Sequence, residues 1–157
     1  MANAFQDLEV WQRACQLTVA TYENLTPLKD FSLKDQIQRA AVSIPSNIAE
    51  GSERGSDKDF IRFLRISKGS CAELRTQLFI LKKLQQQNSI RFTGRLDPLI
   101  KEGHEISSML EGLIKHIQSR IWPPLISCIL YLISYHFFTM SIVTTDNPPE
   151  SITDTPE

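Results

Sequence analysis

Apolar side chains recur every three or four residues through most of the first 117 positions, and this spacing limits the chain to helices. Alternation of β-branched and polar residues, the mark of strands, is nearly absent. Two long rows show the helical spacing best: Phe60, Leu64, Ser67, Cys71, Leu74, Leu78 and Leu81, and then Leu96, Leu99, Gly103, Ile106, Leu110, Leu113 and Ile117. The sequence therefore predicts an all-α protein.

Four amphipathic segments with short connections predict an antiparallel up-down four-helix bundle. The first segment covers residues 5–24, and its inward face should consist of Leu8, Trp11, Cys15, Thr18 or Val19, and Tyr22. The second should begin with Ser32 as its cap, with Asp35 three residues later. Ser56 should cap the third, which reaches about Gln87, and the fourth follows Thr93 and Gly94.

Several residues should interrupt or tighten this pattern. Pro45 removes a backbone donor and should bend the second helix, where Ser43, Ser46 or Asn47 could satisfy the freed groups. Gly51 and Gly55 should bracket an exposed turn. Small residues in the middle of the third helix allow close approach of another backbone, from the same bundle or from a second subunit: Ser67, Gly69, Ser70, Cys71 and Ala72.

The composition changes after residue 117. We expect a bundle domain over 1–117, an apolar extension over 118–143 and a disordered acidic tail over 144–157. Residues 125–143 have no polar face and approach the roughly 20 residues that span a bilayer. Three interpretations stay open: a membrane anchor, an extra helix packed on the bundle, and a translated extension without a role.

Charge is distributed unevenly along the chain. All 17 lysines and arginines lie within residues 1–120, whereas four of the 18 acids follow, so this part carries a net charge of +3. Bases predominate on one side of the third helix and in the turn before it. The candidate nucleic-acid-binding residues are Arg54, Lys58, Arg62, Arg65, Lys68, Arg75, Lys82 and Lys83. Two interpretations stay open: a phosphate-binding surface, or a solvated helix face in which Asp59 and Glu73 pair with the bases.

No motif indicates an enzyme, a metal site or a cofactor. The acids Glu50, Glu53, Asp57 and Asp59 lie where capping and the helix dipole account for them. His104 and His116 lack a third ligand. Three widely spaced cysteines indicate neither a disulfide framework nor a zinc site, and they suit a reducing compartment. We therefore expect no catalytic residues, no metal ligands and no cofactor.

Four blocks of sequence resemble the four-helix bundle family known as the 23S ribosomal RNA intervening sequence protein, or S23, family. They are FQDLEVWQRA, SIPSNIAEG, DFIRFLRISKGSCAELRTQL and ISSMLEGLIKHI, in that order over residues 5–117. The resemblance implies an up-down bundle that forms ring-shaped homopentamers. The family is related to the accessory variability protein of diversity-generating retroelements, which binds nucleic acid and a reverse transcriptase.

The resemblance and the charge pattern together give two functional hypotheses. The first is a non-enzymatic bacterial, cytoplasmic homo-oligomer that binds the RNA or DNA backbone through the basic side of the third helix. The second is an interaction scaffold, for a partner such as a reverse transcriptase, that makes no nucleic-acid contact of its own. Membrane contact through residues 125–143 is a third and weaker idea, because family members usually end near the position of Ile117.

Overall fold

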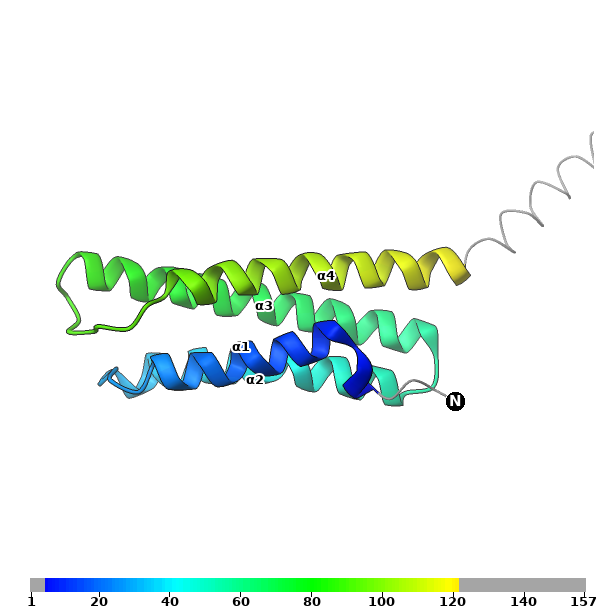
Figure 1. Ribbon diagram of the computed structural model, residues 1–157, viewed down its shortest axis with the longest axis horizontal. Helices are drawn as coiled ribbons and strands as arrows, with labels where there is room; N and C mark the ends of the chain where they lie inside the picture. The colour runs from blue at the N-terminus through cyan, green and yellow to red at the C-terminus, as the bar shows by residue number, and fades with distance from the viewer. Residues whose placement is uncertain (1–4, 122–157) are drawn as a thin grey trace, which may run out of the picture. The chain divides into compact units, whose positions relative to one another are not determined.

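Four α-helices and one short 3-10 turn make up residues 5–121, which are the residues that the computed structural model describes. The 3-10 turn is Phe5–Asp7, and the helices are α1 (Glu9–Asn24), α2 (Phe31–Glu53), α3 (Asp57–Gln86) and α4 (Asp97–Ile121). Successive helices run in opposite directions, and no strand occurs within residues 5–121 (Figure 1). This confirms the predicted all-α, up-down four-helix bundle.

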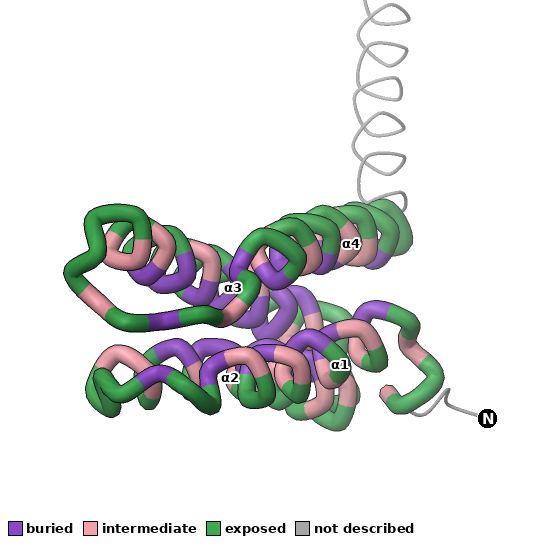
Figure 2. The backbone as a smooth tube through the Cα atoms, turned by 60° about the vertical axis from the view of Figure 1, so that its left-hand side comes forward, coloured by how far each residue is buried: buried purple, intermediate pink, exposed green. Residues whose placement is uncertain are grey.

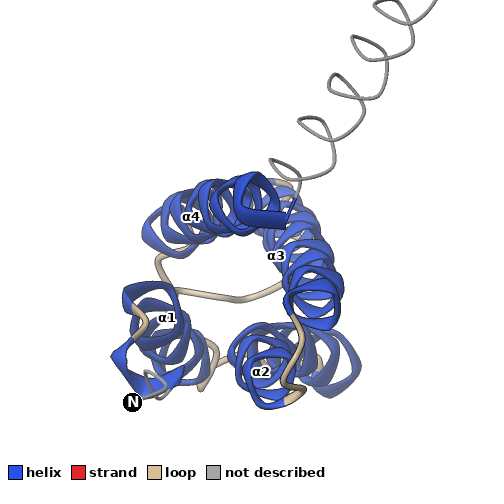
Figure 3. Ribbon diagram, turned by 90° about the vertical axis from the view of Figure 1, so that its right-hand side faces the viewer, coloured by secondary structure: helices blue, strands red, loops and turns tan. Residues whose placement is uncertain are grey.

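The four helices surround a common core, seen along the bundle axis in Figure 3. Each helix turns one side inward, so buried and exposed stretches alternate along the backbone (Figure 2). The core consists mainly of leucine and isoleucine, and many of these side chains are completely buried: Leu17, Ile37, Ile44, Ile48, Leu64, Leu74, Leu78, Leu81, Ile106 and Leu110. Residues 5–119 belong to one compact unit. Residues 118–121, the first four of the predicted apolar extension, continue α4, whereas the rest of the extension and the acidic tail lie outside the described residues.

The inward face predicted for α1 is wrong. The buried residues are Val10, Ala14, Leu17 and Thr21, one row away from the predicted set. Val19 is 58% exposed and Tyr22 45% exposed. The helix also starts later than expected, because Phe5–Asp7 form a separate 3-10 turn whose Phe5 ring meets Trp11 edge-on at 5.2 Å.

The expected cap of α2 is wrong by two residues. Asp30, not Ser32, accepts a hydrogen bond from the Leu33 backbone N–H, at 3.0 Å. An Asp carboxylate at this position satisfies one of the free N–H groups at the start of the helix. Asp35 instead pairs with Arg39 one turn later, at 2.8 Å.

Pro45 lies within α2, and the helix continues through it. Its missing N–H leaves the carbonyl of Ala41 without its usual helical donor. Thr18 Oγ1 of α1 lies 2.9 Å from that carbonyl oxygen and 2.8 Å from the Ala14 carbonyl oxygen. The Ala14 carbonyl already accepts the Thr18 backbone N–H within α1, so the single hydroxyl proton is best used as the replacement donor to Ala41. The predicted local side chains bond elsewhere: Asn47 to the Ser43 carbonyl and Ser46 to the Val42 carbonyl. The prediction that they satisfy the group freed by Pro45 is therefore wrong.

The joint between α2 and α3 is shorter than predicted. Gly51 is not in an exposed turn but is buried within α2, where a Cβ would lie 2.5 Å from the Cβ of Phe63. Gly55 has φ +73°, a left-handed conformation that glycine adopts without strain. Ser56 caps α3 as predicted, because its Oγ accepts from the Asp59 N–H at 3.1 Å.

Small side chains bring α2 and α3 together. Ser67 donates to the Ile44 carbonyl at 3.0 Å, and Ser70 lies 2.9 Å from Ser43, oxygen to oxygen. Cys71 is fully buried in the same region. Three of the five small residues therefore serve packing within the bundle, whereas Gly69 and Ala72 are exposed.

The connection between α3 and α4 lies at the same end of the bundle as the connection between α1 and α2 (Figure 1). The backbone N–H of Arg95 donates to Asn24 Oδ1 at 3.3 Å, which links the two connections directly. In α4 the predicted buried row is confirmed except that Ile114 takes the place of Leu113, which is half-buried.

Candidate nucleic-acid interface

The eight candidate bases do not form one continuous surface. Although seven of them lie on α3, they divide into three groups by position and by contacts. Arg54, Lys58, Arg62 and Arg65 form an exposed group at the α2–α3 joint; Lys68, Arg75 and Lys82 lie beside α4; and Lys83 lies near the far end of α3. We call the first group the basic cluster.

Two guanidinium groups of the basic cluster stack on one ring. The guanidinium carbons of Arg54 and Arg62 lie 5.2 and 5.1 Å from the centroid of Phe63. Phe63 is itself 6% exposed and packs beside Gly51 in α2. Cation–π contacts of this kind hold a planar donor group at a fixed place on the surface. The buried ring therefore positions two exposed charges.

Ion pairing within the basic cluster is limited. Arg54 pairs with Glu50 one turn earlier in α2. Lys58, Arg62 and Arg65 form no ion pair with any residue in the described part of the chain. The expected partners bond elsewhere: Asp59 accepts from Ser56 Oγ at 2.7 Å and Glu73 from Gln77 Nε2 at 3.1 Å.

The second group binds α3 to α4. Lys68 Nζ lies 2.7 Å from Glu111 Oε2, and this contact lowers the pKa of Glu111. Lys82 pairs with Asp97 in the first turn of α4, where an acid is also favoured by the helix dipole. The stem of Arg75 packs against Gly103, where an added Cβ would lie 3.1 Å from Arg75 Cγ. Lys68 and Lys82 thus have ion-pair partners in the bundle, whereas Arg75 only packs against α4, and its buried Nε makes no hydrogen bond within the described residues.

Sequence reasoning missed an ion pair between α1 and α4. Arg13 makes two hydrogen bonds to the Glu102 carboxylate, of 2.8 and 2.9 Å, across 89 residues of sequence. The hydrogen bond raises the pKa of Arg13 and lowers that of Glu102. The pair borders a groove of about 560 Å³ with Gln16, Leu17 and Pro98. No local pattern reveals such a pair, because its two members only meet when the first and last helices pack together.

The described residues offer little to a metal ion or a nucleophilic mechanism. They contain no group of three or more His, Cys, Asp or Glu side chains that could hold a metal. Burial raises the pKa of the Cys71 thiol to about 12, so it stays protonated near neutral pH. No helix within residues 5–121 is long and apolar enough to cross a membrane. The predicted apolar stretch at 125–143 lies outside this range.

Comparison with known proteins supports the resemblance seen in the sequence. Residues 6–112 match the 23S rRNA-intervening sequence protein family. Among solved structures, a protein of unknown function from the S23 ribosomal protein family of Bacteroides thetaiotaomicron is 26% identical, with a TM-score of 0.58. The match covers 68% of this chain and 98% of that protein. A search of curated proteins finds no match. The chain belongs to the 23S rRNA-intervening sequence protein family.

Proposed function

We propose that the protein is a non-enzymatic helical-bundle protein that binds the phosphate backbone of RNA or DNA through the basic cluster. The observation that carries this proposal is the grouping of four exposed bases at one joint, with Arg54 and Arg62 stacked on Phe63. Guanidinium groups present donors in a planar fork that matches phosphate oxygens. Fixing them before binding reduces the conformational entropy lost on contact.

Recognition should depend on charge and shape rather than on base sequence. Phe63 is covered by the bundle and cannot stack on a nucleobase. Contacts to phosphates position a protein on nucleic acid without reading its sequence. Affinity should therefore fall as the salt concentration rises, with a slope that reports the number of phosphates contacted.

The structure narrows the set of proposed binding residues. Lys68 and Lys82 form ion pairs with acids of α4, and Arg75 packs against that helix. Reversing the charge of Lys68 would place a new acid beside Glu111 and destabilise the bundle. The test should therefore change Arg62 and Arg65, which have no such partner in the described residues.

The expected association into a homo-oligomer, a pentamer by family resemblance, is part of the proposal. Each copy would contribute one basic cluster, and the fields of several copies would add. We propose the bacterial cytoplasm as its location. The alternative function is a scaffold for a protein partner such as a reverse transcriptase, and the exposed side chains of Phe79 and Ile80 favour it.

The test is a salt titration of binding between the full chain and structured ribosomal RNA. An Arg62→Glu/Arg65→Glu variant is compared with an Arg91→Glu/Lys101→Glu control, which changes the net charge equally at exposed positions whose bases form no ion pair among the described residues. We expect the first variant to bind at least about tenfold more weakly and to lower the salt slope by about 2. Equal losses in both variants, or no binding by the wild type at low salt, would refute the proposal and favour the scaffold.

A further inference from the structure

Phe31 is the most exposed large apolar residue in the part of the chain that the structure describes, at 76%. It lies in the first turn of α2, directly after the capping residue Asp30. Helical side chains tilt toward the N-terminus of their helix, so this ring points toward the end of the bundle. No aromatic ring or guanidinium group of residues 5–121 stacks on it. The ring is therefore open to a planar ligand.

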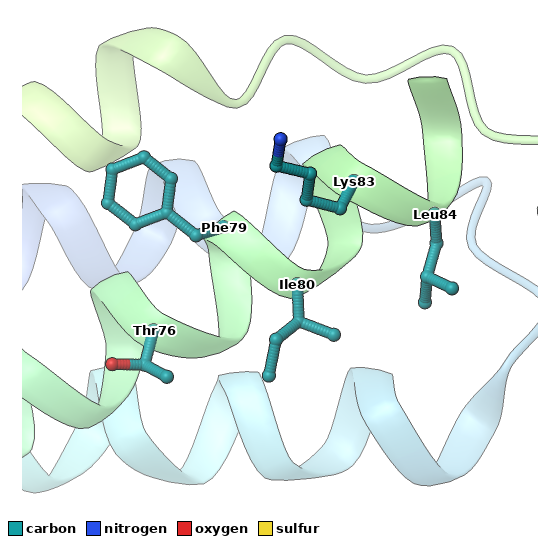
Figure 4. A pocket seen from close by; sticks show the side chains of 5 residues that line it. All are labelled: Thr76, Phe79, Ile80, Lys83 and Leu84. Carbon is teal, nitrogen blue, oxygen red and sulfur yellow. The ribbon is translucent and has the colours of Figure 1, made fainter. Parts of the chain in front are cut away.

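Phe79, the other exposed phenylalanine of residues 5–121, has different surroundings. It lines a shallow, mostly apolar pocket of about 360 Å³ on α3 together with Thr76, Ile80, Lys83 and Leu84 (Figure 4). Apolar neighbours of this kind suit a protein partner. Phe31 instead stands between two bases in sequence, Lys29 and Lys34, and bases suit an anionic partner. The two rings therefore belong to different kinds of surface.

Three bases lie around the connection that leads from α1 to Phe31. Lys29 belongs to this connection and is exposed. Lys34 folds back over it, because its Nζ donates to the Thr26 carbonyl at 3.3 Å. Arg95 belongs to the α3–α4 connection, and its backbone N–H donates to the side chain of the last residue of α1, at 3.3 Å. We call Lys29, Phe31, Lys34 and Arg95 the tip cluster.

The tip cluster carries positive charge that the bundle does not neutralise. None of its three bases forms an ion pair with a described residue. Most acids near them in sequence have other partners: Asp30 caps α2, Asp35 pairs with Arg39, and Asp97 pairs with Lys82. Glu23 has no ion pair in the described part of the chain, and one acid does not balance three bases. An anionic ligand would therefore find unpaired bases beside an uncovered ring.

Arg95 also borders a recess between the end of α3 and the start of α4. The recess has a volume of about 580 Å³, and its polar lining residues include Lys82, Gln85, Thr93 and Arg95. Gln85 Nε2 donates to the Phe92 carbonyl at 2.9 Å. The Thr93 hydroxyl and the Arg95 guanidinium group form no hydrogen bond within residues 5–121, so both can donate to a ligand. A volume of this size is in the range of sites that bind small molecules or single nucleotides.

We propose that the tip cluster binds an unpaired stretch of RNA or DNA, with Phe31 stacked on a nucleobase and the three bases in contact with the flanking phosphates. Bases inside a duplex are stacked on one another, so a ring on a protein surface reaches only unpaired bases. Stacking on an aromatic ring tolerates any base, because every base has a flat face. The inference rests on the proposed function in taking nucleic acid as the ligand, and it adds a second contact of a different kind.

The tip cluster and the basic cluster lie at opposite ends of α2 (Figure 1). This helix has 23 residues, and at a rise of 1.5 Å per residue it separates the two clusters by about 35 Å. The basic cluster contacts phosphates only, because its own ring is covered by two arginines. The ligand that engages both clusters is therefore a structured nucleic acid in which a paired segment and an unpaired segment lie about this distance apart.

Two substitutions at one position separate stacking from apolar bulk. Phe31→Leu keeps an apolar side chain without an aromatic face, and Phe31→Trp, the matched control, keeps such a face. The position is exposed, so the core is left intact, and circular dichroism checks the helical content. Each full-length variant is titrated with single-stranded oligouridylate and with a blunt RNA duplex of the same length.

We expect Phe31→Leu to bind oligouridylate about tenfold more weakly than the wild type and Phe31→Trp to bind it at least as tightly. Neither substitution should change the affinity for the duplex. The added tryptophan should lose fluorescence on binding oligouridylate, because a stacked base quenches it. Lys29→Glu/Arg95→Glu should lower the salt slope for oligouridylate by about 1.4, which is 0.7 for each lost phosphate contact on a single strand.

Equal affinity of Phe31→Leu and the wild type for oligouridylate, or an equal loss on the duplex, would overturn the inference. If the wild type binds the duplex through Arg62 and Arg65 but does not bind oligouridylate, the inference fails and the proposed function stands. Binding of oligouridylate that depends on Phe31, without binding of the duplex, would support the inference and count against the basic cluster.

Discussion

The hydrogen bond from Thr18 to the Ala41 carbonyl, which Pro45 leaves without a backbone donor, allows a prediction of its energy. Pro45 has no N–H, so the carbonyl of the fully buried Ala41 depends on Thr18 Oγ1, 2.9 Å away, for a donor. The same oxygen lies 2.8 Å from the Ala14 carbonyl, which does not depend on it because the Thr18 N–H donates to that carbonyl within α1. In Thr18→Val this carbonyl loses its partner, and a buried polar group left unsatisfied costs about 1–3 kcal/mol. Because Thr18 is only half-buried, we expect about 1–2 kcal/mol of lost unfolding free energy.

The same substitution should cost less when residue 45 has an N–H. In a Pro45→Ala background the new N–H donates to the Ala41 carbonyl, as in any helix. Thr18→Val then removes only the second of two donors to the Ala41 carbonyl, and we expect the unfolding free energy to fall by about 0.5 kcal/mol or less. The two substitutions should therefore show a coupling free energy of about 1 kcal/mol.

Urea unfolding of the four chains, followed by circular dichroism, measures this coupling. Thr76→Val is the control, because its hydroxyl also bonds a carbonyl four residues earlier, at 2.8 Å, but in a helix turn with an ordinary backbone donor. Thr76→Val should lower the unfolding free energy only slightly, and by the same amount with proline or alanine at position 45. If Thr18→Val costs the same with proline and with alanine at position 45, the hydroxyl does not replace the missing donor and the reasoning is wrong.

Two further predictions concern packing and pH. Gly51→Ala should lower the unfolding free energy by about 1 kcal/mol, because overpacking against Phe63 costs about 1–3 kcal/mol and the gain in helix propensity returns about 1 kcal/mol. Gly69→Ala should raise the unfolding free energy, because no atom lies near the added methyl group. Urea unfolding of both variants checks this, and shifts of the same sign would contradict it. The Arg13 hydrogen bond lowers the pKa of Glu102, so its stabilisation is present above the ordinary value of 4.5 and is lost as the pH falls through the lowered value. Arg13→Met should flatten this dependence in urea midpoints measured across acid pH, and an unchanged profile would count against it.

The sequence predicted the architecture well where only one apolar row was present. In α3 the row from Leu64 to Leu81 is buried as expected, and Ser56 caps the helix. In α1 the sequence offers two rows, and the larger side chains of Trp11, Val19 and Tyr22 favoured the wrong one. Periodicity measures the spacing of apolar residues but not which of two rows faces the core.

The candidate site was predicted only in part for a similar reason. A helical projection places all the α3 bases on one broad side, but it does not show where the neighbouring helix lies. Lys68 and Lys82 meet acids that are 43 and 15 residues away in sequence, and only the folded structure brings these groups together. The contact of Arg54 and Arg62 with one ring likewise joins residues from two elements.

Because Arg54 and Arg62 both stack on Phe63, the positions of two surface charges depend on the packing of a buried ring. Phe63 sits against the backbone of α2 at Gly51, where there is no space for even a methyl group. Local opening of the α2–α3 hairpin would release the ring and allow both guanidinium groups to spread apart. The rate of hydrogen exchange of the amides around Phe63 would then report how often the two guanidinium charges leave their positions on the ring. Substitutions in the core near Phe63 would change the electrostatic field at this end of the bundle although they alter no charged residue.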